Sequence, residues 1–354
     1  MNANGDRKIA VGVLGATGMV GQNFVKFLDK HPWFDLTRVG ASDRSAGKNY
    51  SEATSWRLDG AMPPHVAGLT VSDCVPCDGA PRLMFSATDA SVATEIEQAF
   101  AKAGHVVVSN SRNHRMEPDV PLLVPEVNPD HLKVIPQQQR RRGWTGQIAT
   151  NPNCSTVVLA MALAPLRPFG IQRVVVTTMQ AISGAGYPGV ASMDINANVI
   201  PFIGGEEEKM QQETQKILGD VTADGFRPLA AKVSAHCNRV PVVNGHTITV
   251  SVEFERKPSE AEIIEAFSNF RSVPQERKLP SAPPNPVIYM QDKDRPQPRR
   301  DTERENGMAV FVGRLRPCPV FDYKFIALGH NTVRGAAGAA VLNAELMYSE
   351  GLLD

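Results

Sequence analysis

The sequence predicts an α/β protein built from a doubly wound parallel sheet and a second domain of α+β type. In the first half of the chain, short apolar runs alternate with segments of helical periodicity, as is typical of parallel strands buried on both faces. In the second half, residues 247–254 alternate strictly between polar and apolar side chains, which indicates a sheet with one covered face. A length of 354 residues also suits about two domains.

The composition indicates a globular protein without a dominant charge. Hydrophobic residues make up 42% of the chain, and 37 basic residues balance 37 acidic ones. Because nucleic acids and anionic membranes attract basic surfaces, neither is expected as a main partner. The five scattered cysteines suggest no disulfide framework, and no apolar run approaches the ~18 residues of a membrane span. The N-terminus lacks a signal-peptide pattern, so we expect a cytoplasmic protein.

A glycine-rich turn follows the first predicted strand, at 8–14, and leads into a helix that ends near His31-Pro32. Strand, glycine turn and helix form the Rossmann-like unit that binds dinucleotides, because glycines let the backbone approach a pyrophosphate at the helix N-terminus. The spacing is G-x-x-G-x-x-G over Gly12, Gly15 and Gly18, rather than the G-x-G-x-x-G fingerprint. A glycine turn without a ligand therefore stays the alternative.

The second predicted strand, at 36–42, ends where the adenosine ribose of a dinucleotide would lie. An acidic residue there suits the 2′-hydroxyl of NAD, and a basic residue suits the 2′-phosphate of NADP. Both kinds occur, as Asp43 and Arg44. Because Ser42, Arg44 and Ser45 together offer donors and positive charge, the sequence favours NADP, with a solvated polar loop as the alternative.

Further strands at 82–87 and 105–110, with a helix at 91–103 between them, extend the parallel sheet. Arg112 and Arg115 follow the end of the second of these strands, where ligands collect, and the guanidinium of either could hold an anion. A surface arginine is the alternative. The polar run at 137–142 predicts a solvated loop. Cys74 and Cys77 have the spacing of metal ligands, but no second pair accompanies them and we expect no metal.

A cysteine lies at the junction between a predicted strand and a predicted helix in the middle of the chain. Residues 147–150 form a short strand pattern, Pro152 and Asn153 interrupt it, and the apolar run at 157–166 predicts a buried helix. Cys154 is therefore expected at or next to the helix N-terminus, where the helix dipole favours the thiolate. It is a candidate nucleophile, with a small buried core residue as the alternative.

The second half combines strands with two amphipathic or polar helices. Glu206 and Lys209, three residues apart, would share one face of a helix that begins near residue 204. The remaining expected elements are a strand at 173–182, a glycine turn at 183–189, a strand at 247–254, a helix at 259–271, a loop at 280–300, strands at 308–315 and 323–328, and a last helix at 331–350.

Six motifs follow one another along the chain: Gly15–Gly21, Asn151–Thr156, Gln180–Gly189, Glu206–Met210, Asn238–His246 and His330–Gly335. Together, in this order, they make the chain resemble the aspartate-β-semialdehyde dehydrogenases of archaea and fungi nearly end to end. The resemblance implies a glyceraldehyde-3-phosphate-dehydrogenase-like fold and NADPH-dependent reduction of β-aspartyl phosphate to aspartate semialdehyde through a cysteine thioester. That reaction belongs to the biosynthesis of the aspartate-derived amino acids.

The resemblance also implies roles for individual residues. Cys154 matches the nucleophile and His246 the acid/base group, while His236 is a competitor that sequence distance cannot exclude. The implied catalytic set is Cys154, Gln180 and His246, and the implied substrate-binding set is Arg112, Asn113, Glu206, Lys209 and Arg239. The glycine turn, the second-strand loop and the resemblance together give a predicted set for NADP(H): Gly15, Thr17, Gly18, Met19, Val20, Ser42, Arg44, Ser45, Ser86, Ser183, Gly184, Asn331 and Thr332.

The predicted cofactor domain comprises residues 1–150 and 331–354, and the predicted catalytic and dimerisation domain comprises 151–330. The resemblance implies small-molecule substrates and a homodimer or homotetramer. Two alternatives stay open. A malonyl-CoA reductase would use the same cysteine chemistry, although it tends to have Thr-Pro-Leu-Cys where this chain has Asn151-Pro152-Asn153-Cys154. A catalytically silent NADP-binding sensor would need neither Cys154 nor His246.

Overall fold

The computed structural model describes residues 8–353. They divide into two compact units. Unit 1 comprises residues 8–123, 130–151 and 336–353, and unit 2 comprises residues 124–129 and 152–335. Each unit has its own six-stranded sheet.

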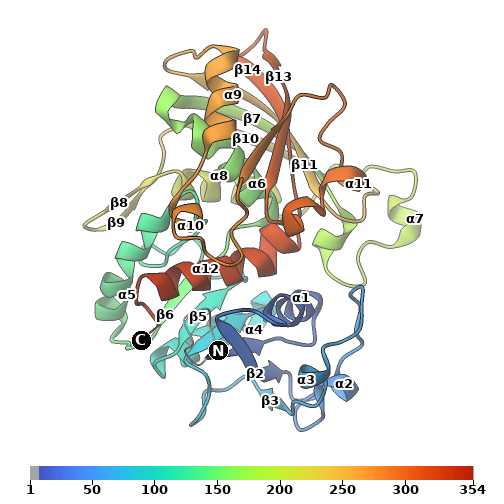
Figure 1. Ribbon diagram of the computed structural model, residues 1–354, viewed down its shortest axis with the longest axis vertical. Helices are drawn as coiled ribbons and strands as arrows, with labels where there is room; N and C mark the ends of the chain where they lie inside the picture. Colours follow the sequence, from blue (N-terminus) through green and yellow to red (C-terminus); the bar gives the residue numbers. More distant parts are fainter. Residues whose placement is uncertain (1–7, 354) are drawn as a thin grey trace. The chain divides into compact units, whose positions relative to one another are not determined.

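Unit 1 is built on a parallel sheet with the strand order β3-β2-β1-β4-β5-β6 (Figure 1). The order reverses direction between β1 and β4, and in such sheets ligands bind at the carboxyl ends of the strands beside this switch point. The prediction of a doubly wound sheet is confirmed. The strands are β1 (Ile9–Leu14), β2 (Phe34–Ala41), β3 (Val71–Asp73), β4 (Leu83–Ser86), β5 (Val106–Ser109) and β6 (Gln147–Thr150).

The helices of unit 1 pack against this sheet and against one another. Five of these strands form where predicted because their apolar side chains are buried, as Leu83–Phe85 of β4 and Val106–Val108 of β5 show. The short strand β3 was not predicted. Helix α1 directly follows the glycine turn and packs against the last helix, α12. The longer helices are α1 (Met19–Leu28), α4 (Ala90–Lys102), α5 (Ile135–Arg142) and α12 (Gly338–Ser349), and the short ones are α2 (Tyr50–Ala53) and α3 (Pro64–Ala67).

The prediction of a solvated loop at 137–142 is wrong, because these residues belong to α5. Gln138 is fully buried, and its amide donates to the carbonyl oxygens of Asp119 and Ile148 and accepts from the backbone N–H of Ile148. A buried amide whose hydrogen bonds are all made in this way is not distinguished from a solvated one by hydropathy.

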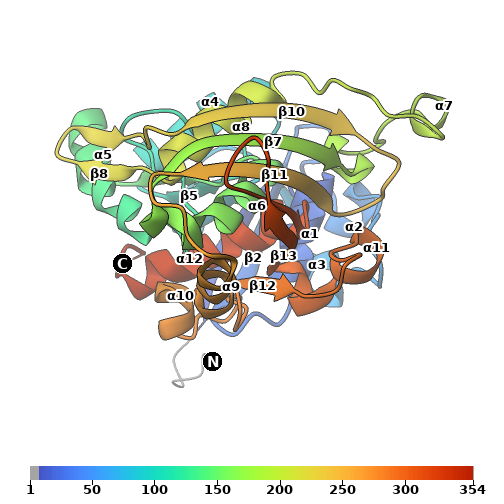
Figure 2. The ribbon, with the colours of Figure 1, turned by 90° about the horizontal axis from the view of Figure 1, so that it is seen from above.

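Unit 2 is built on a mixed sheet with the strand order β10-β7-β11-β14-β13-β12. The outer pairs β10–β7 and β12–β13 are parallel, and the inner pairs are antiparallel. Figure 2 shows β10, β7 and β11 side by side, with α7 lying beyond the end of β10. The strands are β7 (Ile171–Gln180), β10 (Lys232–Arg239), β11 (His246–Phe254), β12 (Val287–Met290), β13 (Val310–Pro317) and β14 (Tyr323–Gly329), and β8 (Asp220–Thr222) pairs only with β9 (Gly225–Arg227).

The alternation in β11 matches its two environments. Ile248, Val250 and Val252 are buried, whereas Thr249 points to solvent. The strand thus has one covered face, as predicted. The helices of unit 2 are α6 (Cys154–Leu163), α7 (Ser192–Ile195), α8 (Glu206–Ile217), α9 (Glu260–Asn269), α10 (Val273–Glu276) and α11 (Pro298–Asp301), and short 3-10 turns span Ala164–Phe169, Ile182–Ala185 and Arg304–Gly307.

Three expectations for the second half need correction. Strand β10 was not predicted, because five of its eight side chains are polar or charged and lie on an edge strand. The expected loop at 280–300 contains β12 and α11. The last helix does not run from residue 331, since α12 begins at Gly338 after a π-helical turn, Val333–Ala337.

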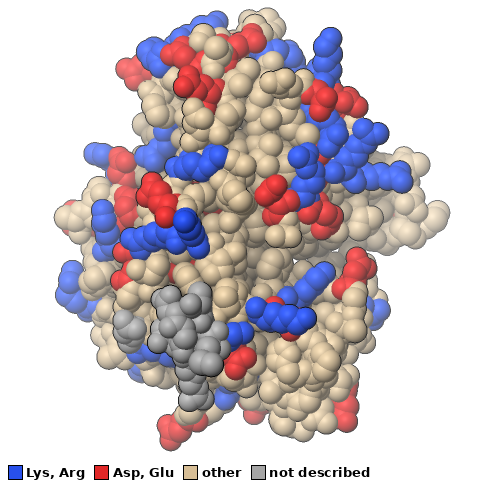
Figure 3. Space-filling model, viewed as in Figure 1, with Lys and Arg blue, Asp and Glu red and all other residues tan. Residues whose placement is uncertain are grey.

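The surface carries both signs of charge. On the face drawn in Figure 3, Lys and Arg side chains are interspersed with Asp and Glu side chains. Among the described residues, no helix has both the length and the apolar character that a membrane span requires.

Candidate active site

Helix α6 begins at Cys154. The side-chain oxygen of Asn153 accepts hydrogen bonds from the backbone N–H groups of Ser155 at 2.9 Å and Thr156 at 3.3 Å, which is the arrangement of a helix N-cap. All residues of α6 after Cys154 are buried, so the helix cannot rotate without disrupting its packing. Cys154, which is only half-buried, is therefore fixed in the first turn, where a thiolate is favoured.

The imidazole of His246 lies against this thiol. Nε2 of His246 is 3.1 Å from Sγ of Cys154, and the imidazole is completely buried at the start of β11. The backbone N–H of Ala181 points at Nδ1, at 3.0 Å. Because a backbone N–H can only donate, Nδ1 must be an acceptor, and the ring proton sits on Nε2 facing the sulfur. His246 is thus a neutral hydrogen-bond donor to Cys154.

Burial agrees with a neutral imidazole. Desolvation, followed by the positive charge of Arg239 and by His330, lowers the pKa of His246 from 6.5 to about 3. An imidazolium would also carry a proton on Nδ1 that conflicts with the N–H of Ala181. A thiolate at Cys154 must therefore be stabilised by the N-terminus of α6, by the N–H of His246 and by nearby positive charge rather than by an imidazolium.

Arg239 supplies that positive charge. It ends β10, is only 6% exposed, and donates from Nη1 to the carbonyl oxygen of Ala181 at 2.8 Å. Burial lowers its pKa, but its electrostatic partners include Cys154 and Glu206. Gly184 covers both Arg239 and His246, because a Cβ built on Gly184 would lie 3.0 Å from Nη1 and 3.1 Å from Nε2.

The carboxylate of Glu206 connects the other members of the site. It accepts from Nζ of Lys209 at 2.9 Å, from Nε2 of Gln180 at 3.3 Å, and at both oxygens from Nδ2 of Asn153 at 2.9 and 2.8 Å. Glu206 begins α8 and Gln180 ends β7. The predicted shared face of Glu206 and Lys209 is confirmed.

A second carboxylate, Glu213, lies about two turns further along α8. It accepts from the backbone N–H of Asn153 at 2.6 Å, so both carboxylates hold the residue that precedes Cys154. Sequence reasoning missed Asn153 and Glu213 in this role. The Glu206-to-Glu213 spacing of a helix face was the available signal, but nothing local connects it to a residue 60 positions away.

The family profile described as "Semialdehyde dehydrogenase, NAD binding domain" matches residues 10–135, and "Semialdehyde dehydrogenase, dimerisation domain" matches residues 163–334. The aspartate-semialdehyde dehydrogenase of Methanothermobacter thermautotrophicus is 51% identical over 96% of this chain and 99% of its own length. This chain belongs to the aspartate-semialdehyde dehydrogenase family. The enzyme of Schizosaccharomyces pombe is 49% identical over 97% of this chain and 99% of its own.

Solved structures of the aspartate-semialdehyde dehydrogenase family agree with the fold. The Candida albicans enzyme, whose structure was determined with NADP, superposes with a TM-score of 0.91 at 41% identity, covering 98% of this chain and 100% of that one. A Vibrio cholerae enzyme gives a TM-score of 0.77 at 27% identity, covering 97% of this chain and 99% of that one. The predictions of family and fold class are confirmed.

The catalytic set predicted for this chain lies in unit 2. Cys154, Gln180 and His246 are there, with Glu206, Lys209 and Arg239 around them. The competitor His236 is exposed on β10, whereas His246 contacts the thiol. Ser183, Gly184, Asn331 and Thr332, from the predicted cofactor set, also belong to unit 2.

The rest of the predicted cofactor set lies in unit 1. Gly15, Thr17 and Gly18 lie in the β1–α1 connection, and Met19 and Val20 begin α1. Gly15 has a φ of +72°, and a Cβ there would lie 2.5 Å from the carbonyl oxygen of Ala87. The remaining four residues are Ser42 and Arg44, which are exposed after β2, Ser45, which is half-buried, and Ser86, which is buried at the end of β4.

Arg112 and Asn113, predicted to bind substrate, follow β5 in unit 1. Arg112 is exposed. The amide of Asn113 donates to the carbonyl oxygen of Ala90 at 2.8 Å and to the hydroxyl of Thr94 at 2.6 Å, which attaches the segment to α4. Their role toward substrate stays a prediction.

A buried carboxylate in unit 1 was also missed. Glu97 is fully buried on α4 and accepts from the hydroxyls of Ser86 at 2.6 Å and Ser109 at 2.7 Å, which end β4 and β5. Its second oxygen is 3.6 Å from Nε2 of the buried His114. Burial raises the pKa of Glu97. Only the period of α4 could have indicated that this glutamate points inward.

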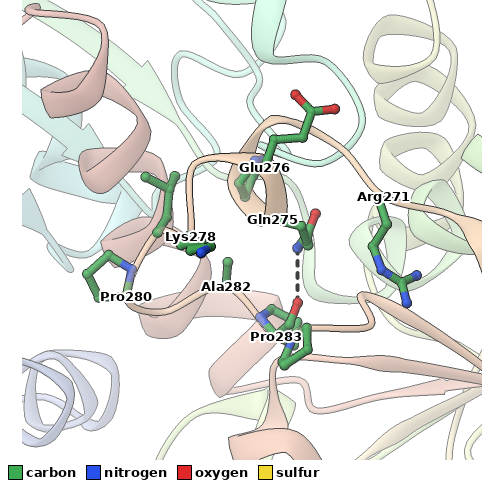
Figure 4. A pocket seen from close by; sticks show the side chains of 10 residues that line it. Arg271, Gln275, Glu276, Lys278, Pro280, Ala282 and Pro283 are labelled. Carbon is green, nitrogen blue, oxygen red and sulfur yellow. Dashed lines mark hydrogen bonds between the residues drawn. The ribbon is translucent and has the colours of Figure 1, made fainter.

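A hollow in unit 2 lies apart from the catalytic set. It has a volume of about 540 Å³ and is walled by the proline-rich segment around α10, where Gln275 donates to the carbonyl oxygen of Pro283 at 3.1 Å (Figure 4). None of its lining residues belongs to the predicted sets. Over residues 8–353, no group of three or more His, Cys, Asp or Glu side chains is arranged to hold a metal.

Proposed function

We propose that the chain catalyses the NADPH-dependent reductive dephosphorylation of β-aspartyl phosphate to aspartate semialdehyde. The observation that carries this proposal is the contact of 3.1 Å between Sγ of Cys154, at a helix N-terminus, and a buried neutral His246. Membership of the family, whose relatives are named for this aldehyde, supports the choice of substrate. The Glu206–Lys209 pair and Arg239 add the charged groups that a small dianionic acyl phosphate requires.

Acyl transfer begins with the thiolate of Cys154. Its electron pair forms the S–C bond to the acyl carbon, the acyl C–O bond to the phosphate breaks, and phosphate leaves with that pair. NADPH, when bound, supplies the hydride that reduces the resulting thioester carbon. The oxyanion that forms then re-forms the carbonyl and expels Sγ as thiolate.

His246 acts in these steps as a donor of a hydrogen bond. Its Nε2–H donates a hydrogen bond to the thiolate before attack and can donate one to the oxyanion that forms next to it. The hydrogen bond to sulfur is made again when the C–S bond breaks. Since Nδ1 is held by the N–H of Ala181, the donating atom does not change during the cycle. Gln180, fixed by Glu206, is assigned to orienting the acyl group.

We assign Arg239 to the substrate carboxylate, because a guanidinium fork matches a carboxylate with two hydrogen bonds. Glu206 is assigned to the substrate's ammonium group, and Lys209 to the phosphate. Without such anchors the acyl carbon would not be held near the thiol, and the advantage of proximity would be lost.

For the cofactor we assign unit 1, within the predicted domain 1–150 plus 331–354, and NADP rather than NAD. Helix α1 suits a pyrophosphate, because its N-terminus has no side-chain cap and its first turn contains no acidic residue. Ser42, Arg44 and Ser45 suit the 2′-phosphate. Substitution of Arg44 by Glu should raise the KM for NADPH far more than the KM for NADH.

We further propose a homodimer formed through the open face of the unit 2 sheet and the segment 187–202. This segment exposes Tyr187, Met193 and Phe202, of which Met193 is 89% exposed, and Val175 lies exposed on β7. The match to a dimerisation domain over 163–334 supports the assignment. Sedimentation analysis tests it, while a tetramer and a cytoplasmic location stay predictions.

The deciding experiment is the reverse reaction. NADP reduction is measured with aspartate semialdehyde, with and without phosphate, and in parallel with malonate semialdehyde plus CoA. Phosphate-dependent reduction of NADP with the aspartate aldehyde alone is expected, and Cys154→Ala should abolish it while NADPH binding survives. Activity with the CoA pair alone would replace the proposal by a malonyl-CoA reductase, and no activity with either would favour a sensor.

A further inference from the structure

The segment His330–Gly335 contacts Cys154 and the residue that precedes His246, all within unit 2. At one end, Asn331 is 2% exposed and its amide is engaged at both atoms. Oδ1 accepts from the backbone N–H of Gly245 at 2.9 Å, and Nδ2 donates to the hydroxyl of Ser183 at 2.8 Å. Gly245 directly precedes His246, and Ser183 directly precedes the Gly184 that covers it.

The other end of the segment lies against the nucleophile. A Cβ built on Gly335 would be 2.6 Å from Cβ and 3.0 Å from Cα of Cys154, so the backbone of Gly335 is in direct contact with that residue. The N–H of Gly335 donates to the carbonyl oxygen of His330 at 2.9 Å, which closes the segment on itself. The two ends therefore cannot move independently.

A buried ion pair anchors the segment. Arg334 is completely buried, and its two terminal nitrogens donate to the two carboxylate oxygens of Glu126 at 2.8 and 2.6 Å. The same guanidinium lies 3.2 Å from Sδ of Met161, two turns along α6 from Cys154. Breaking a buried pair by removing one partner leaves an uncompensated charge, so this anchor resists displacement.

We infer that His330–Gly335 is a brace that sets the position of Cys154 relative to His246, with Asn331 and Arg334 as positioning residues. Asn331 acts on His246 through Gly245 and Ser183, and Arg334 acts on Cys154 through α6 and Gly335. The inference rests on the proposed function in one respect, since it takes the Cys154–His246 pair to be the reactive pair.

The test measures the reactivity of the thiol in the protein without cofactor. Alkylation of Cys154 by iodoacetamide is followed against pH by mass spectrometry of its peptide. Cys237 does not interfere at neutral pH because burial raises its pKa to about 11. Asn331→Ala should slow alkylation near neutral pH by about tenfold or more and move its pH midpoint upward, because the Nε2–H donor is displaced.

Matched variants separate positioning from stability. Asn269→Ala removes an exposed amide at the end of α9 and should leave the profile unchanged. Ser183→Ala, which removes one partner of Asn331 and no charge, should shift the profile in the same direction by a smaller factor. All three variants are compared with wild type by thermal unfolding. A purely structural role of Asn331 would change the unfolding temperature without moving the pH midpoint of alkylation.

An unchanged alkylation profile in folded Asn331→Ala would overturn the inference. Because no cofactor is present, a role of Asn331 restricted to nicotinamide contact would give that unchanged result. Failure of the proposed function is seen separately, as absence of phosphate-dependent NADP reduction by wild type. If wild type shows no phosphate-dependent NADP reduction but Asn331→Ala still shifts the alkylation profile, the brace stands and only the assigned reaction is overturned.

Discussion

Substitution of Gly184 by alanine should damage the active site without disturbing the fold. The added methyl carbon would lie 3.0 Å from Cε1 and 3.1 Å from Nε2 of His246, and 3.0 Å from Nη1 of Arg239. These distances are shorter than nearly all contacts of real Cβ atoms, so the imidazole or the guanidinium must retreat by a few tenths of an ångström. Neither group has space to do so, since His246 is completely buried and Arg239 is 6% exposed.

The turn that carries Gly184 also resists withdrawal. Its neighbours Ile182 and Ser183 donate from their backbone N–H groups to the carbonyl oxygens of Val242 at 2.8 Å and Val243 at 3.2 Å. A misplacement of catalytic groups by about 1 Å can cost ~10²-fold in rate, which corresponds to about 2.7 kcal/mol. We therefore expect kcat/KM of Gly184→Ala to fall by about 10- to 100-fold.

Steady-state kinetics in the direction of NADP reduction, with thermal unfolding in parallel, measure this effect. Gly184 does not have a positive φ, so alanine causes no backbone strain there. Gly68→Ala is the control, because a Cβ at Gly68 meets no atom within 4 Å and its φ is −88°. A kcat/KM within about threefold of wild type for a folded Gly184→Ala would refute the geometry of this site.

Three further outcomes are expected. The pKa of His246 falls from 6.5 to about 3 on folding, so its contribution to stability is complete above about pH 6.5 and is lost as the pH falls toward 3. In urea unfolding, wild type should therefore lose more stability between about pH 7.5 and about pH 5 than His246→Gln does. Equal losses would contradict the buried neutral imidazole. Glu97→Ala leaves two buried hydroxyls without their acceptor and should cost about 1–3 kcal/mol of unfolding free energy, whereas the exposed Glu95→Ala should stay within about 0.5 kcal/mol. Arg239→Lys should raise the KM for aspartate semialdehyde by about tenfold or more, because an ammonium group does not reproduce the bidentate fork; an unchanged KM would remove Arg239 from the carboxylate site.

The sequence was most informative where one physical constraint governed a whole segment. Parallel strands such as β4 and β5 are buried on both faces, so they appear as continuous apolar runs. The one-sided burial of β11 gave strict alternation. The interruption at Pro152 and Asn153 and the apolar run after it located Cys154 at the start of α6, because helix termini carry local signals.

Contacts between distant segments carry no such local signal. The bond between Asn153 and Glu206 joins residues 53 positions apart, and the N–H that fixes the tautomer of His246 comes from a residue 65 positions away. Every residue except proline carries a backbone N–H, so the sequence does not indicate which of them donates to His246. Helix α5 was missed for a related reason. The hydrogen-bond partners of the buried Gln138 amide are backbone groups, which any sequence would provide.

Because the side chain of Asn153 both caps α6 and donates to Glu206, few residue types suit the position before the nucleophile. Asparagine, aspartate and serine are about equally good N-caps in general. Here the side-chain oxygen faces the N–H groups of α6, and the side-chain nitrogen, 2.9 and 2.8 Å from the two oxygens of Glu206, faces a carboxylate. An aspartate would match this shape atom for atom and still bring two anions together. At this position the exchange of one nitrogen for oxygen separates a good cap from an electrostatic conflict beside the thiolate.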